Sequence, residues 1–387
     1  MTEKTVMRLF LEPVDVALFR AGRSFTAGSD HRARSLFPPN PSTVLGALRS
    51  KLLMDTGVSL AAFAEKQDEA QVAGDQIGWP DKAPPFALRG PFIAAVEKRD
   101  ADGNVRRVKP YYPLPADVVK VGKTYHLLKP LALDADLPFD ANWPKADPPL
   151  CPLWLSNKEK QNEAEGWVDE ETLQALLSGD KDVLTASEVW SDERLFARES
   201  RFGVGIDSQR KCYKDGMLYQ VEFIRPREGI GLAVDVVEGA PSFDQSGLLS
   251  MGGESRPFRY YRLETPGQQV QPPDKGFKVY FATPAYFKCG WLPEKWSTWF
   301  GGDVQLVAVA LRRARTISGA RVDTKSQQGG TLAKAGYKFV PAGSVYYFKA
   351  KGEATYSGKP VSEFDKNDAN SKSGYGTVLF GKWDYLA

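Results

Sequence analysis

The chain contains few of the residues that most often bind metals or transfer protons in active sites. Its 387 residues include three cysteines and two histidines. Cys151, Cys212 and Cys289 are too far apart in the sequence for the paired spacing of a zinc site. HExxH, CxxC and GxSxG patterns are also missing. These absences predict no metal and no cofactor, and scattered thiols in odd number are typical of a reducing compartment.

Long hydrophobic runs are missing as well. No stretch approaches the roughly 20 apolar residues that cross a membrane as a helix. The first residues, MTEKTVMRLFLEP, lack the apolar segment of a signal peptide. We therefore expect a soluble, cytoplasmic protein.

The net charge is only +3, but the basic residues are unevenly distributed. The first basic window, from Arg20 to Lys51, holds six basic residues and one acidic residue. The second basic window, from Arg312 to Lys338, holds seven basic residues and one acidic residue. Two such windows in a nearly neutral chain favour local patches that bind a polyanion. The alternative is that both windows are ordinary solvated surfaces.

The stretch SLFPPNPSTVLGALRSKLL, residues 35–53, predicts a helix with a rigid start. Asn40 is a favourable N-cap residue and Pro41 suits the first helical position. Apolar residues then recur with the helical period and predict a buried face, made of Val44, Leu45, Leu48 and Leu52.

The remaining elements predict an α+β fold, because strands and helices are mixed without strict alternation. A second helix is expected in VDEETLQALLSGD, ending at Gly179. Residues 201–223 are expected to form a long hairpin that turns through Lys-Asp-Gly at 214–216.

The glycines near the C-terminus resemble a P-loop but do not satisfy its chemistry. Residues 376–382 match G-x4-G-K, yet Trp383 stands where a P-loop needs Ser or Thr for magnesium. We expect instead that Gly374, Gly376 and Gly381 expose backbone N–H groups beside Lys382, where they contact phosphates. The alternative is a tight turn that closes the last strand.

His31 and His126 leave an enzymatic alternative open. A histidine in a basic loop can act as a general base in RNA cleavage, although a solvent-facing or phosphate-facing role is more common. The tryptophans at 291, 296 and 299 are expected in a core or an interface rather than in a base-stacking platform.

Several blocks, in the same order along the chain, resemble the third Cmr subunit of type III-B CRISPR effector complexes, a family of the RAMP superfamily. These blocks are LEPVDVALFRAGRSF, SLFPPNPSTVLGALRSKLL, ESRFGVGID, GMLYQVEFIRP, LLSMGGESRPFRYY and GYGTVLFGKW. The resemblance covers most of the chain, except residues 132–182 and 356–372.

The resemblance implies two ferredoxin-like (RRM-like) domains, which we place at residues 1–195 and 196–387, the second with a glycine-rich loop. It implies no catalysis by this subunit. The family holds the 5′ tag of the guide RNA (crRNA) and docks the large palm-domain subunit and the adjoining backbone RAMP subunit. A projecting hairpin can act in the family as a thumb on the guide, a part that the hairpin at 201–223 would play.

Three groups of residues are the candidate RNA contacts. The first is Arg20, Arg23, Arg34, Asn40, Ser42, Thr43, Arg49 and Lys51. The second is Gly374, Gly376 and Lys382, and the third is Arg256 and Arg259. Two other functions remain open: a metal-independent RAMP endoribonuclease that uses His31 or a tyrosine, and a structural adaptor whose basic windows contact acidic partners.

Overall fold

The structure is a computed structural model that describes residues 5–20, 32–79, 82–132, 150–206, 213–239, 241–266, 271–272, 276–322, 331–333 and 335–386. Arg23 and His31 lie outside these residues, so the predictions made for them are not addressed by it. The described residues form a mixed α+β fold in which most strands pair antiparallel.

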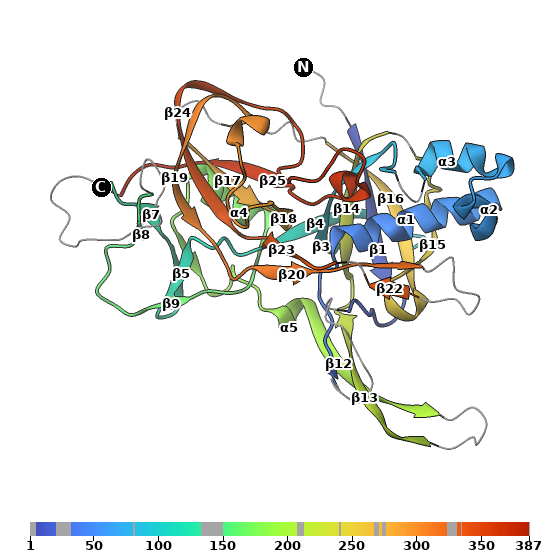
Figure 1. The fold of residues 1–387 in the computed structure, drawn as a ribbon. Helices are drawn as coiled ribbons and strands as arrows, with labels where there is room; N and C mark the ends of the chain where they lie inside the picture. The colour runs from blue at the N-terminus through green and yellow to red at the C-terminus, as the bar shows by residue number, and fades with distance from the viewer. Residues whose placement is uncertain are drawn as a thin grey trace.

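The largest element is a seven-stranded antiparallel sheet (Figure 1). Its strands, in spatial order, are β10 (Trp167–Asp169), β4 (Val105–Pro113), β3 (Ala87–Arg99), β14 (Ile230–Glu238), β1 (Thr5–Pro13), β16 (Arg256–Pro266) and β15 (Ser246–Met251). The central strand pairs run between segments far apart in the sequence, such as Met7 with Val236 and Leu9 with Arg262. The first strand of the chain and residues 230–266 are therefore parts of one sheet.

Helix α1 (Pro41–Thr56) packs on this sheet and buries the predicted face, which confirms the sequence pattern. Asn40 is at the N-cap, as expected, but its side chain makes no capping hydrogen bond; its carbonyl accepts the N–H of Thr43 at 2.9 Å. Helices α2 (Leu60–Ala64) and α3 (Gln71–Ile77) follow, with the short 3-10 helix η1 (Asp68–Ala70) between them.

A four-stranded sheet is made by the last part of the chain. Its order is β19 (Phe300–Ala310), β24 (Val345–Tyr356), β17 (Gly276–Phe281) and β25 (Val378–Lys382). The change from one main sheet to the other therefore falls between Pro266 and Gly276, later than the predicted division after residue 195.

Helix α4 (Glu170–Ser178) joins the two main sheets. Its limits agree with the prediction: Asp169 accepts the N–H of Thr172 at 2.9 Å, and Gly179 is left-handed. The helix packs against β25, and its residues share a core with strands of both halves, including Tyr112 and Tyr347. The two halves are thus held together by a common apolar core.

The smaller sheets complete the fold. One has the order β11 (Val183–Thr185), β6 (Thr124–Leu127), β5 (Val118–Val121) and β9 (Gln161–Glu163), and another the order β18 (Ala285–Tyr286), β23 (Tyr337–Val340) and β20 (Arg315–Ile317). Two pairs are formed by β21 (Ala320–Val322) with β22 (Thr331–Ala333) and by β7 (Lys129–Pro130) with β8 (Leu153–Trp154). The remaining 3-10 helices are η2 (Gly253–Ser255), η3 (Trp296–Thr298) and η4 (Ala369–Lys372).

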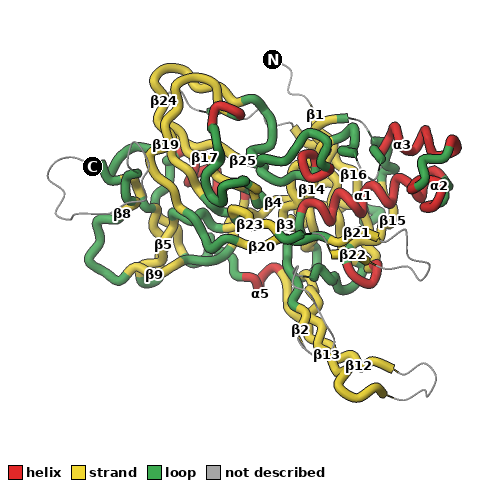
Figure 2. The backbone as a smooth tube through the Cα atoms, viewed as in Figure 1, coloured by secondary structure: helices red, strands yellow, loops and turns green. Residues whose placement is uncertain are grey.

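A long hairpin of β12 (Phe196–Ile206) and β13 (Tyr213–Pro226) projects from the body (Figures 1 and 2). The hairpin was predicted, but its turn was misplaced. Lys214, Asp215 and Gly216 lie within β13, and the connection falls in residues 207–212, outside the described part of the chain. Turn-forming residues alone were a poor guide, because residues 214–217 lie in a register shift of the ladder and pairing resumes beyond them, at Ile206 with Tyr213.

Candidate nucleic-acid interface

The root of the hairpin is anchored by the two segments that flank residues 21–31. Strand β2 (Arg32–Ala33) pairs with β13 in parallel, and Ala17 forms a bridge with Ile224. A further bridge joins Arg20 to Ser35. The first basic window therefore begins at Arg20 beside this root and returns to it at β2 and Ser35, where the hairpin leaves the body.

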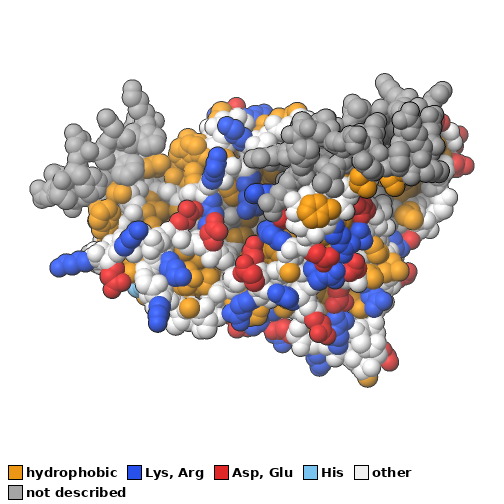
Figure 3. Space-filling view, turned by 90° about the horizontal axis from the view of Figure 1, so that it is seen from below, with side chains coloured by type: hydrophobic (Ala, Val, Ile, Leu, Met, Phe, Trp, Pro, Cys, Tyr) orange, Lys and Arg blue, Asp and Glu red, His pale blue; other side chains and the backbone are white. Residues whose placement is uncertain are grey.

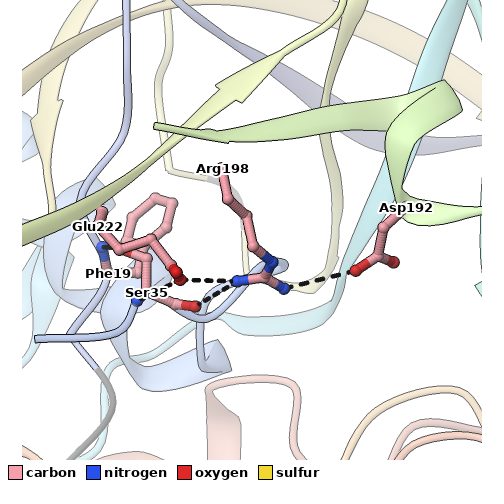
Figure 4. Close-up of polar contacts among 5 residues, drawn as sticks. All are labelled: Phe19, Ser35, Asp192, Arg198 and Glu222. Carbon is pink, nitrogen blue, oxygen red and sulfur yellow. Dashed lines mark hydrogen bonds and ion pairs between the residues drawn. The ribbon is translucent and has the colours of Figure 1, made fainter. Parts of the chain in front are cut away.

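A buried carboxylate, Glu222, organises this root (Figure 4). Its Oε1 accepts hydrogen bonds from the Ser35 N–H at 3.3 Å and from an Nη of Arg198 at 2.9 Å. The Ser35 hydroxyl donates to the Glu222 carbonyl at 2.5 Å and accepts the N–H of Phe19 at 3.3 Å. Arg198 also reaches Asp192 at 3.4 Å and remains partly exposed. Because a buried charge is stable only when it is paired and hydrogen-bonded, this network fixes the direction of the hairpin.

Replacing Ser35 by alanine tests the network. The loss of the hydroxyl leaves the N–H of Phe19 and the carbonyl of Glu222 buried without this partner, so we expect the free energy of unfolding to fall by about 1–3 kcal/mol. Urea denaturation measures it. Ser187→Ala, which removes an exposed hydroxyl bonded to Thr185, is the control and should cost almost nothing. Equal stability of the two variants would contradict the role of Ser35.

A ladder of ion pairs continues along the outer side of the root. Glu199 accepts hydrogen bonds from Arg225 and Arg201, both at 2.8 Å, and Arg225 also donates to Asp15 at 2.9 Å. These bonds, that of Arg225 first, lower the pKa of Glu199. The arginines on this side are thus largely neutralised by neighbouring carboxylates. Figure 3 shows the same mixture, with Lys and Arg side chains interspersed with Asp and Glu on the face that carries the hairpin.

The loop before β16 also reaches the hairpin root. The Arg256 guanidinium lies 4.9 Å from the ring centre of Phe223, and the Arg201 guanidinium lies 4.8 Å from it. The N–H of Gly253 bonds the Leu18 carbonyl at 2.8 Å, and a Cβ on Gly252 would lie only 2.4 Å from that oxygen. The third predicted group and the first therefore meet at the root.

The second basic window contributes to the same region. Desolvation by the surrounding protein lowers the pKa of Arg315 of β20, although its side chain reaches the surface. Smaller contributions come from the charges of Asp192 and Arg198, both of the hairpin root. Arg312, in contrast, donates to the carbonyls of Leu114 and Ala164, at 3.1 and 2.7 Å, and holds the body together. Arg315 of the second basic window therefore lies within electrostatic reach of the hairpin root.

The other predicted cations fall into two classes. Arg34 and Arg259 are exposed, and no described residue pairs with either. Arg20 is also exposed, and its backbone bridges Ser35, the residue after Arg34. Arg49 is turned inward, donating to the carbonyls of Gly78 and Trp79 at 2.9 and 2.8 Å, and burial lowers its pKa. Lys51 pairs with Asp55 and lies over the Tyr260 ring. Arg49 and Lys51 therefore make contacts within the protein and are not part of the candidate RNA surface.

The prediction of an exposed glycine loop is wrong. Gly374, Gly376 and Gly381 are all buried. The N–H of Gly376 donates to the Pro284 carbonyl at 2.8 Å, and the Gly374 carbonyl accepts the Thr283 hydroxyl at 2.6 Å. The glycines are needed because other backbone segments approach them closely, not because a phosphate does. Lys382, at the end of β25, is exposed.

The start of α1 contacts this loop. The hydroxyls of Ser42 and Tyr375 lie 3.2 Å apart. Tyr375 stands between Gly374 and Gly376, so the second group of candidate RNA contacts lies beside the first. Asn40, Ser42 and Thr43 are half-buried at this junction rather than displayed on an open surface.

No acid–base or metal constellation is evident among the described residues. His126 shares a 2.8 Å hydrogen bond with the Thr124 hydroxyl. Within the same residues, no group of three or more His, Cys, Asp or Glu side chains is placed to hold a metal ion. In the described part of the chain no helix is long and apolar enough to cross a membrane. Trp296 and Trp299 pack in an aromatic core, as predicted.

Sequence reasoning missed the residues that form the root network. Ser35 and Glu222 occur in the blocks used for the resemblance and Arg198 directly precedes one, but nothing local marks an ion pair between residues 24 positions apart. Glu222 stands between two apolar strand residues, Val221 and Phe223, and all three are buried. A carboxylate between two apolar strand residues was the one feature of the sequence that could have indicated this network.

The fold and this root are those of an α+β protein with a projecting, arginine-rich hairpin. The chain belongs to the family described as CRISPR-associated protein (Cas_Cmr3), whose family model matches residues 9–383. No curated protein matches it.

Two solved structures are similar over most of their length. One is a chain of the type III-B Cmr-beta complex bound to cognate target RNA, with 16% identity, 88% of this chain and 86% of that chain covered, and a TM-score of 0.46. The other is a chain of a Csm1–Csm4 cassette in complex with AMPPNP, with 13% identity, 99% and 97% covered, and a TM-score of 0.29.

Proposed function

We propose that this protein is a non-catalytic, RNA-binding subunit of a type III-B effector complex, and that it holds the 5′ tag of the guide RNA at the root of the β12–β13 hairpin. The observation that carries the proposal is that the first basic window and the start of β16 both contact this root, with Arg315 of the second basic window within electrostatic reach of it. Membership in the family supports the assignment to the effector complex.

The exposed side chains at the root and on the hairpin suit single-stranded RNA. Arg34, Arg259 and Arg315 are exposed cations available to phosphates. Phe202 and Val204 alternate along β12 and are 73% and 46% exposed, so they share one apolar face of the hairpin; Ile206, beyond a β-bulge, is also 68% exposed. An aromatic side chain beside free cations is a suitable contact for an unstacked base. This face gives the hairpin the properties of the thumb that the family resemblance implies.

The finer architecture and the partners belong to the same proposal. Each main sheet, with the helices that cover it, would be the centre of one ferredoxin-like domain. The neighbours would be the large palm-domain subunit and the adjoining backbone RAMP subunit, and the protein would act in the cytoplasm.

The proposal predicts which cations bind RNA. Arg34→Ala combined with Arg315→Ala removes one exposed cation from each basic window. We expect weaker binding of a 5′-tagged guide RNA and a salt slope of log K against log salt that is smaller by about 1.4, since each phosphate contact to a single strand contributes about 0.7. Filter binding over a series of salt concentrations measures both.

The control is Lys123→Ala, an exposed lysine in the turn between β5 and β6, which lies away from the hairpin root (Figure 1). It should leave the slope unchanged. If the double variant and the control bind tagged RNA equally, with the same slope, the RNA site is not at the hairpin root.

A further inference from the structure

The helical lobe at residues 54–77, made of the end of α1 with α2 and α3, has a charge opposite to that of the basic windows. It holds five acidic residues and one lysine, namely Asp55, Glu65, Asp68, Glu69, Asp75 and Lys66. Figure 1 shows α2 and α3 together at one end of the molecule. Because such a surface repels phosphates, the lobe is not part of the surface proposed for RNA.

A groove of about 630 Å³ lies beside this lobe, between the ends of α1 and α3, the start of β3 and the loop from β14 to β15. Its floor is apolar and consists of the buried side chains of Leu52, Ile77 and Phe86. Its rim is polar and exposed, with Gln76 and Asp244 among its residues. An apolar floor with polar side chains around it offers both apolar contacts and hydrogen-bonding or charged groups to a partner.

Exposed apolar side chains and a carboxylate without an ion pair lie beside the groove. Val72 is 67% exposed and stands one helical turn before Gln76, so it lies on the same side of α3 as the rim. Leu60, at the start of α2, is 74% exposed. Asp244 forms no ion pair with any described residue, whereas Asp55, also on the rim, is paired with Lys51. The surface thus offers apolar contacts and an uncompensated carboxylate side by side.

We propose that this groove binds a basic, amphipathic segment of a neighbouring protein subunit. Apolar side chains of that segment would cover Phe86 and Val72, and a Lys or Arg would pair with Asp244. Charge complementarity selects this occupant, because the acidic lobe disfavours RNA and attracts cations. The inference rests on the proposed function, since the neighbouring subunit is one of the effector complex.

Site-specific crosslinking in the assembled complex tests the location. Benzoylphenylalanine replaces Val72 in one variant and Val183 of β11, which is 43% exposed, in the control. On irradiation, the variant at Val72 should crosslink to another subunit, at a segment rich in Lys and Arg with interspersed apolar residues. The variant at Val183 should not crosslink to that segment. Crosslinks from position 72 to RNA or to a second copy of this chain, or none in an intact complex, would overturn the inference.

Charge reversal tests the chemistry. Asp244→Lys should weaken the affinity for the crosslinked subunit at least about tenfold, because like charges then face each other. Asp102→Lys, an exposed reversal in the turn from β3 to β4, should leave the affinity unchanged. Affinity equal to wild type in the Asp244 variant would contradict the proposed pairing.

The RNA content of the same complexes separates the two proposals. If tagged RNA is bound but position 72 meets no basic segment, only the groove proposal fails. If the purified subunits neither assemble nor retain RNA, the proposed function itself fails, and the groove proposal fails with it.

Discussion

Replacing Gly374 by alanine is expected to lower the free energy of unfolding by roughly 2–5 kcal/mol. Gly374 has a φ of 107°, in the region that side chains rarely adopt, and a Cβ there would lie 2.3 Å from the Gly90 carbonyl oxygen. Both backbone segments are buried, so neither can move aside without breaking contacts between the two halves. Thermal or urea unfolding of the purified protein measures the loss.

Gly358→Ala is the matched control. Gly358 also has a positive φ, of 76°, but no atom lies within 4 Å of the Cβ that would be added. We therefore expect only the conformational cost, about 1–2 kcal/mol. If the two substitutions cost the same, the close approach to Gly90 contributes nothing and the burial of the glycine loop has been misjudged.

Replacing Lys278 by methionine is expected to cost about 3–5 kcal/mol at neutral pH, because it removes the cation whose charge acts most strongly on the buried carboxylate of Asp117. Asp117 and Lys278 are both buried. Lys278 Nζ donates to the Leu176 carbonyl at 3.0 Å, and the Tyr347 hydroxyl donates to Asp117. Burial raises the pKa of Asp117 and lowers that of Lys278, while the charge of each opposes the shift of the other.

The pH dependence of this variant gives a second test. Without Lys278, the pKa of Asp117 in the folded protein rises further above its value in the unfolded chain. A carboxyl with a raised pKa stabilises the fold at pH values below the unfolded pKa, and this contribution is lost as the pH rises through the folded pKa. The variant should therefore lose least stability in acid and most at neutral pH.

The double variant Asp117→Asn with Lys278→Met is the control for that interpretation. It carries no buried charge at either position, so it should be more stable than Lys278→Met alone at neutral pH and should lack the added pH dependence. Equal stability of the single and double variants at neutral pH would show that Asp117 does not depend on Lys278.

The two helices predicted from the sequence were confirmed, whereas α2, α3 and the pairing of the strands were not predicted. Helices α1 and α4 begin and end at local signals, Pro41 in one and Asp169 with Gly179 in the other. A sheet has no such local signals for its partners. Nothing in the segment around Met7 indicates that its neighbour is Val236, so the sequence could not show that residues 230–266 share a sheet with β1.

The candidate site was only partly predictable for the same reason. Arg34 and Arg49 cannot be told apart from the sequence, because both are arginines close to the same three prolines. Their different roles are decided by the end of α3, whose carbonyls at Gly78 and Trp79 receive Arg49. The glycine loop illustrates the same limit: its composition indicates freedom from side chains, but not whether a ligand or another segment of backbone uses the space.

The order of strands in the seven-stranded sheet has a consequence for synthesis on the ribosome. Strand β1 lies between β14 and β16. Its edges can be paired only after Val236 and then Glu264, the partners of Met7, have been translated. At about 5–20 residues per second the delay is on the order of 10–50 s. During that interval the nascent chain carries an apolar strand with both edges open, which makes it a natural client for ribosome-associated chaperones.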